Sequence, residues 1–194
     1  MKVILTLIAG LVFFQTQGQI VIDLPSLTLA GGEQESNMIS ISLAEIALID
    51  IESETADINI DFNFGSTQEA GIVSNGETSI TNNSLWLNYT SAVALGQTRN
   101  ISVALSQELP SGINLSLVLD SYTGNGQGQF GIPAPALSLN SISQNVLTNI
   151  GGAYTGNGNS NGHKLNYQLN INNFSNVSNE NFVATVVYTI SPAF

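Results

Sequence analysis

The chain has 194 residues and no cysteine, and it carries three Lys or Arg residues against fourteen Asp or Glu residues, a formal net charge of −11. Nucleic acids and anionic membrane surfaces are bound through Lys and Arg, so this charge argues against both as partners. Without cysteine there are no disulfides, and an exported fold must depend on packing and strand hydrogen bonds.

The N-terminus has the features of a secretory signal peptide over residues 1–18. Lys2 is followed by an apolar run over residues 3–14, and small residues precede a cleavage point after Gly18. The run is shorter than the roughly 20 residues that a membrane-spanning helix needs. We therefore predict an exported protein, secreted or held at the cell surface or in the periplasm, with no membrane span and with one domain over residues 19–194.

The first strand-like segments come directly after the predicted cleavage point. Residues 20–29 alternate but contain Pro25, which cannot donate to a ladder, so they predict a bent or edge strand. Residues 38–51 alternate with a change of phase at Ala44 and Glu45. A capping-box pattern makes a helix starting at Ser42 the alternative, but the isoleucines that follow favour two strand pieces joined by a bulge or turn.

The middle of the chain contains four segments in which apolar side chains fall on every second residue. They cover residues 56–64, 84–90, 100–106 and 113–120, and Pro110-Ser111-Gly112 predicts a turn between the last two. Each pattern is typical of a strand with one face on the core.

The second half of the chain predicts four more strands, at residues 136–142, 145–150, 164–171 and 181–190. The last has two well-filled faces and is predicted to lie inside a sheet, paired on both sides. The whole pattern predicts an all-β fold, an Ig-like antiparallel Greek-key β-sandwich of about nine or ten strands. Its predicted core contains Ile60, Phe62, Leu87, Leu117, Tyr167, Leu169, Val186 and Tyr188.

A short sequence, YTGNG, occurs twice, beginning at Tyr122 and at Tyr154. Both copies are rich in Gly and Asn, which accept the positive φ of tight turns. One interpretation is that both are hairpin connections. The other is that they come together as a polar rim at one end of the fold, where binding loops commonly lie.

Few residues offer catalytic or metal-binding chemistry. The single histidine, His163, follows Asn161-Gly162 and is interpreted as an exposed turn residue. One histidine without cysteine cannot supply the ligands of a zinc site. The acidic stretch from Asp50 to Asp61 offers oxygen ligands for calcium, but its alternation is also that of a wet strand face. We predict that the chain is not an enzyme and has no catalytic, cofactor-binding or metal-binding residues.

Aromatic residues give the sequence its second functional hypothesis. Trp86 is the only tryptophan, and with Tyr122 and Tyr154 it would supply the aromatic row of an extracellular carbohydrate-binding module. Packing in the core is the alternative for Trp86. The glycine-rich residues 124–131 lack the Gly-Lys-Ser/Thr ending of a phosphate-binding loop.

The last third of the chain resembles secreted bacterial pilin-like β-sandwiches, with spore coat protein U and alternate chaperone–usher fimbrial subunits as the comparison. The resemblance is carried by a Gly/Asn-rich segment at 155–162, a strand at 164–171 and a closing strand at 183–190 with Tyr188 near its end. Residues 84–90, SLWLNYT, also look like segments of uncharacterised exported proteins of Bacteroidetes-type bacteria.

The resemblance implies a structural or adhesive subunit of the cell envelope or surface, with self-association, other envelope subunits or glycans as partners. In the fimbrial families an N-terminal extension completes a neighbour's sheet. Here residues 20–29 would take that part, interrupted by Pro25. Folding back onto the chain's own sheet is the favoured alternative for this segment.

Overall fold

The computed structural model describes residues 19–20, 35–65, 70–72, 78–177 and 181–193. The chain divides into two units, Met1–Glu45 and Ile46–Phe194. The boundary falls where the alternation of apolar side chains changes phase. The predicted signal peptide and most of the predicted strand at 20–29 lie outside the described residues.

In the first unit, β1 (Gln19–Ile20) pairs antiparallel with β2 (Ile41–Ser42). The described residues from 35 to 45 all have exposed side chains. Two strand pieces, β2 here and β3 in the second unit, replace the helix that competed for residues 38–51, so the strand interpretation of this region is confirmed.

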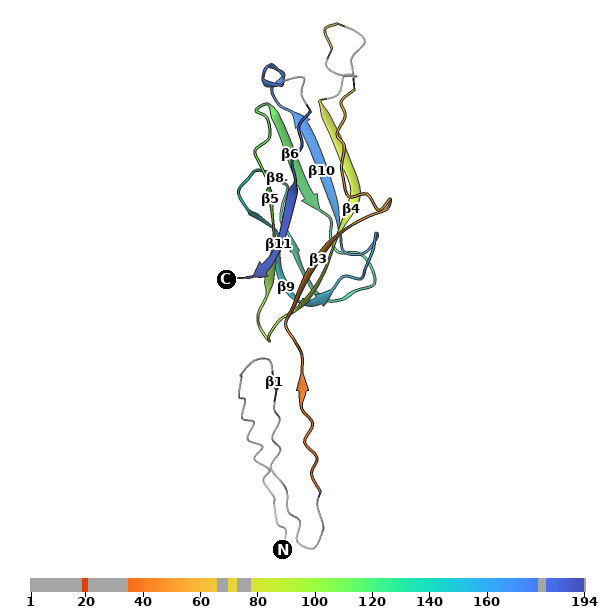
Figure 1. The fold of residues 1–194 in the computed structure, drawn as a ribbon, viewed down its shortest axis with the longest axis vertical. Coiled ribbons are helices and arrows are strands. Elements are labelled where there is room, and N and C mark those ends of the chain that lie inside the picture. Colours follow the sequence, from red (N-terminus) through yellow and green to blue (C-terminus); the bar gives the residue numbers. More distant parts are fainter. Residues whose placement is uncertain (1–18, 21–34, 66–69, 73–77, 178–180, 194) are drawn as a thin grey trace, which may run out of the picture. The chain divides into compact units, whose positions relative to one another are not determined.

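The second unit contains one antiparallel sheet of nine strands, so the predicted all-β fold is confirmed. The order is β11-β5-β9-β4-β10-β6-β8, while β3 pairs with β4 and β7 with β9. Figure 1 shows β6, β10 and β4 side by side. Among the described residues, no helix has the length and apolar composition needed to cross a membrane. The elements are β3 (Ile46–Ser53), β4 (Ser79–Ala92), β5 (Arg99–Leu105), β6 (Ile113–Leu119), β7 (Gln127–Pro133), β8 (Leu137–Ser138), β9 (Gln144–Tyr154), β10 (His163–Ile171), the 3-10 turn η2 (Phe174–Asn176) and β11 (Val186–Pro192).

The core lies on one face of this sheet because apolar residues alternate along the strands. In β5, for example, every second side chain is buried, from Arg99 to Leu105. All eight predicted core residues belong to the core or pack against it. Leu87, Leu117 and Tyr167 are buried, whereas the rest are partly buried: Ile60, Phe62, Leu169, Val186 and Tyr188.

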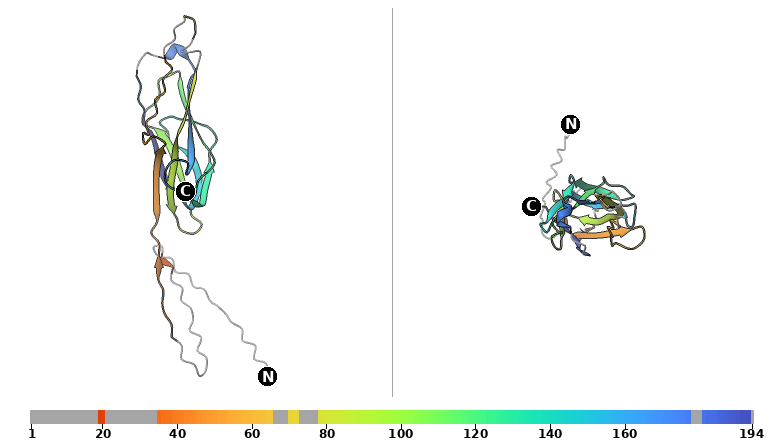
Figure 2. Two further views of the ribbon diagram at one scale, coloured as in Figure 1. Left: turned by 90° about the vertical axis from the view of Figure 1, so that its right-hand side faces the viewer. Right: turned by 90° about the horizontal axis from the view of Figure 1, so that it is seen from above.

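The sheet curls so that strands distant in its order share this core. The hydroxyl of Tyr167 on β10 lies 2.6 Å from that of Tyr188 on β11, the strand at the far end of the sheet order. Burial raises the pKa of Tyr167 to about 12 and raises the pKa of Tyr188 well above its usual value, so both hydroxyls stay protonated even in mildly alkaline solution. The right-hand view of Figure 2 shows the strands of this unit enclosing a common interior.

The predicted strand at 56–64 does not form, although Ile60 and Phe62 still pack against the core. Its Asp and Asn side chains bind nearby backbone N–H groups. Asp57 Oδ1 accepts from the Asn59 N–H at 2.9 Å, and Asn63 Oδ1 accepts from the Gly65 N–H at 2.7 Å. Asp and Asn side chains compete for the backbone N–H groups that a strand would use in its ladder, which explains why the predicted strand is absent.

The closing strand differs from its prediction in position and in pairing. β11 begins at Val186, five residues later than predicted, and extends to Pro192. It pairs with β5 and with no other described strand, so it is an edge strand and the predicted pairing on both sides is wrong. The predicted strand at 136–142 is reduced to the two residues of β8.

The sequence analysis predicted no strand at β7, which overlaps the glycine-rich residues 124–131. Its glycines are needed because β7 runs very close to β9. A β-carbon at Gly128 would overlap the Gly152 carbonyl, and one at Gly131 would lie 2.6 Å from the Thr148 carbonyl oxygen. Glycine, which usually weakens a strand, is here what allows β7 to pair with β9.

Candidate functional site

An open groove crosses the outer face of β3, β4 and the end of β9, opposite the core. Residues directly opposite each other in a ladder share a face of the sheet. Asp50 pairs with Asn88, Leu48 pairs with Thr90, and Thr90 also pairs with Tyr154, so these five side chains lie on one face. The groove has a volume of about 570 Å³ and is completed by Gly156 and Asn157.

The groove combines apolar and polar side chains. Tyr154 is 46% exposed and Leu48 is 63% exposed, so both present apolar surface to solvent. Asp50 is exposed, and its Oδ1 accepts the N–H of Ile51 at 2.8 Å, which orients the carboxylate. Asn88 is buried beneath them, and its amide nitrogen donates to the Gly158 carbonyl at 3.0 Å.

The two YTGNG copies come together beside this groove. The Tyr122 hydroxyl of the first copy donates to the Thr155 carbonyl of the second at 3.2 Å and accepts the Gly126 N–H at 2.5 Å. Of the two interpretations, the structure therefore favours loops that meet over independent hairpin connections.

One side chain, Asn161, binds the same position in both copies. Its Oδ1 accepts the N–H of Asn125 at 3.2 Å, and its amide nitrogen donates to the carbonyl of Asn157 at 2.9 Å. A β-carbon at Gly124 or Gly156, again equivalent positions, would lie 2.6 or 2.8 Å from Asn161 Oδ1. The repeated glycines thus make room for the side chain that joins the loops.

The histidine is buried between these loops and the core, so the interpretation of His163 as an exposed turn residue is wrong. His163 is 1% exposed. Its Nδ1 donates to the Asp120 carbonyl at 2.9 Å, and its Nε2 lies 3.3 Å from the Tyr89 hydroxyl. The ring stacks on Tyr89 and meets the edge of Tyr122, which in turn stacks on Phe130.

The bonding of this cluster places one ring proton of the histidine, and burial opposes a second. A carbonyl only accepts, so Nδ1 carries the proton in the neutral ring. The Tyr89 hydroxyl donates to the Phe130 carbonyl at 2.5 Å, its shorter contact. Burial lowers the pKa of His163, although the Asp120 and Phe130 carbonyls oppose the shift. Both nitrogens face protein groups in a closed interior, which suits a structural residue better than a general base.

The three aromatic residues of the carbohydrate hypothesis do not form one exposed row. Trp86 is 9% exposed and lies on the face of β4 opposite the core cluster, with Lys164 Nζ 5.6 Å from its ring centre. One face of the Tyr122 ring is covered by Phe130. Tyr154 alone among the three presents a largely open ring.

The carboxylates of the acidic stretch from Asp50 to Asp61 do not come together at one site. Within the described parts of the chain there is no group of three or more His, Asp or Glu side chains placed to hold a metal ion. Asp50 is on β3, whereas Asp57 and Asp61 lie in the irregular segment that follows it.

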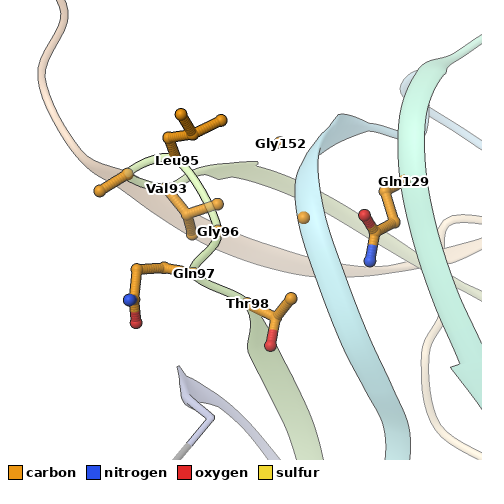
Figure 3. Close-up of a pocket in the computed structure, with 9 residues that line it drawn as sticks. Val93, Leu95, Gly96, Gln97, Thr98, Gln129 and Gly152 are labelled. Carbon is orange, nitrogen blue, oxygen red and sulfur yellow. The ribbon is translucent and has the colours of Figure 1, made fainter.

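A second hollow lies between the turn joining β4 to β5 and strands β7 and β9. Figure 3 shows Gln129 on one side, facing the Val93–Thr98 turn across Gly152, with Leu95 pointing away from the hollow. None of its lining residues has an ionisable side chain. Thr98 supplies a hydroxyl, but no His, Asp, Glu or Lys among the lining residues stands ready to activate it.

Comparison with models of protein families, with curated proteins and with solved structures found no significant match.

Proposed function

We propose that the chain is an exported, non-catalytic structural subunit of the cell envelope or surface that assembles with copies of itself. The observation that carries the proposal is an apolar segment in the first unit, Met38–Leu43, whose large side chains are in water. Met38 is 81% exposed, Ile39 73%, Ile41 66% and Leu43 80%.

This segment has the pattern of a strand that adds to another sheet. Ile39, Ile41 and Leu43 fall on every second residue, so they share one face in an extended chain. Fully burying such a side chain is worth about 1.5–3 kcal/mol, and a partner that covers all three would gain most of that for each. Strand addition uses this arrangement, with backbone hydrogen bonds and alternate side chains in pockets.

The second unit supplies an edge of the matching kind. β11 is hydrogen-bonded to β5, and no other described strand pairs with it. Its sequence, VVYTISP, contains no charged residue, and Val187 is 46% exposed. Edge strands are commonly protected by charges, prolines or bulges, and β11 has only Pro192, at its end, so the rest of this uncharged edge favours pairing with another chain. We propose that segment 38–43 of one copy adds to β11 of the next.

A triple substitution tests this assembly. The mature chain should form oligomers that grow with concentration, and Ile39→Thr/Ile41→Thr/Leu43→Thr should keep it monomeric, since threonine preserves strand propensity but removes the apolar face. Val187→Lys at the β11 edge should have the same effect. Sedimentation velocity over a wide concentration range measures both.

The matched control replaces three apolar residues that are equally exposed elsewhere. Leu95, Ile142 and Phe174 are 97%, 71% and 61% exposed. Leu95→Thr/Ile142→Thr/Phe174→Thr should leave the oligomers unchanged. A wild-type chain that stays monomeric, or a segment variant that oligomerises like wild type, would refute the proposal.

A further inference from the structure

We propose that the groove over β3, β4 and β9 binds a neutral carbohydrate, with the ring of Tyr154 against a sugar face and with Asp50 and Asn157 bonded to its hydroxyls. This function is separate from the self-assembly proposed above. It uses the outer face of the second unit, and neither segment 38–43 nor β11 contributes to the groove.

The charges in the groove select the class of ligand. Asp50 is the only Asp or Glu among the residues that line it, and no Lys, Arg or His contributes. A phosphate, sulfate or carboxylate would meet an uncompensated negative charge. A single carboxylate also falls short of the oxygen ligands that calcium needs. The suitable ligand is uncharged and rich in hydroxyl donors for Asp50.

The shape and polarity of the groove favour a sugar ring among uncharged ligands. A pyranose has an apolar face of C–H groups and a rim of hydroxyls. Tyr154 and Leu48 provide exposed apolar surface, while Asp50 and Asn157 provide acceptors and donors beside it. This is the usual composition of a small-ligand site, in which apolar surface supplies contact area and a few polar groups fix orientation.

The loop that brings Asn157 to the groove is held in place before any ligand arrives. Asn161 donates to the Asn157 carbonyl at 2.9 Å, and Asn88, from the floor, donates to the Gly158 carbonyl at 3.0 Å. Asn161 also binds the other YTGNG copy through the Asn125 N–H. A loop braced by one internal hydrogen bond and tied to its surroundings by two others loses little conformational entropy on binding, which favours affinity.

The test screens the mature chain against an array of neutral and acidic glycans and then titrates the strongest neutral oligosaccharide in solution by calorimetry. Tyr154→Ala and Asp50→Asn should each weaken binding at least about tenfold, because each removes a main contact. The matched controls are Phe174→Ala, another exposed aromatic residue, and Asp61→Asn, another exposed carboxylate. Both should bind like wild type.

Thermal unfolding of each variant separates loss of binding from loss of fold. Asp50 is exposed, so Asp50→Asn should leave the unfolding temperature unchanged. The Ile39→Thr/Ile41→Thr/Leu43→Thr variant should retain full glycan affinity, so this inference and the assembly proposal fail independently. Absence of binding to every neutral glycan, binding of acidic glycans only, or unchanged affinity in both groove variants would overturn the inference.

Discussion

Gly162→Ala is expected to lower the free energy of unfolding by about 2–5 kcal/mol. Gly162 has a φ of 85° and sits where the two YTGNG loops meet β4. A β-carbon there would overlap the Leu87 carbonyl oxygen and lie 2.7 Å from Asn88 Oδ1. The left-handed backbone costs about 1–2 kcal/mol for a residue with a side chain. Forcing atoms into a packed site adds about 1–3 kcal/mol.

The backbone around Gly162 cannot easily move to make room. Its N–H donates to the Thr123 carbonyl at 2.8 Å, and its carbonyl accepts the Thr123 N–H at 2.9 Å. The overlapping Leu87 belongs to the core and is fully buried. Any shift that relieves the overlap must therefore strain the two hydrogen bonds between Gly162 and Thr123 or disturb the centre of the core.

Gly158→Ala is the matched control, because Gly158 has nearly the same φ, 88°, but open space where the β-carbon would go. It should lose only the backbone contribution of about 1–2 kcal/mol. Urea unfolding of both variants at neutral pH measures the difference. Equal losses would show that the junction yields to the extra carbon and that the close packing of the loops on β4 has little energetic weight.

Much of the fold could be predicted because its central strands are strictly alternating. β5, β6 and β10 follow their predicted ranges to within one residue. In these three strands the residues that alternate as apolar in the sequence are the ones that the folded sheet buries. The segment at 56–64 has the same alternation, but there the wet face consists of Asp and Asn, whose side chains bind the backbone that a ladder needs.

The alternation of buried residues along β10 predicts that His163 is buried, but the neighbouring turn sequence led to the opposite interpretation. Leu165 and Tyr167 are buried, and one more step of two residues back along β10 reaches His163 on the same face. Asn161-Gly162 suggested an exposed turn instead. The partners that close over the ring, Tyr89 and Tyr122, are distant in sequence, so no local pattern announces them.

The groove could not be predicted because it depends on strand register. Asp50 faces Asn88 and Thr90 faces Tyr154 only in the pairing that the folded sheet adopts. A shift of one residue would reverse the faces. The carbohydrate hypothesis from the sequence chose residues only because they are aromatic. It therefore included Tyr154, which lines the groove, together with Trp86, which is buried.

The stability of the chain is expected to fall when the pH drops below about 6.5, and His163 should account for the fall. Burial lowers the pKa of His163 in the folded chain, whereas in the unfolded chain it keeps its ordinary value near 6.5. Between these two values the unfolded state binds more protons, so stability increases with pH. The stabilisation is complete above pH 6.5 and is lost toward the folded pKa, with a slope of up to about 1.4 kcal/mol per pH unit.

The groups around the ring are engaged in contacts of their own. Burial raises the pKa of Tyr89 above its usual range, so it stays protonated. Asp120 contributes its carbonyl to the ring, and its carboxylate accepts from Asn166 at 2.9 Å. Lys164, the next residue on β10, faces Trp86 on the other side of the sheet. His163 is the only histidine of the chain, so no other imidazole contributes to the slope below pH 6.5.

His163→Gln isolates this contribution, because glutamine does not titrate and its amide can still donate to the Asp120 carbonyl. Urea unfolding at pH 7.5, 6.5 and 5.5 should show a smaller slope for the variant than for wild type, although the variant is less stable at pH 7.5. Effects of the many carboxylates are common to both proteins and cancel in the comparison. Equal slopes would mean that the ring accepts a proton in the folded chain, and that Nε2 then donates to Tyr89 or Phe130 at no net cost.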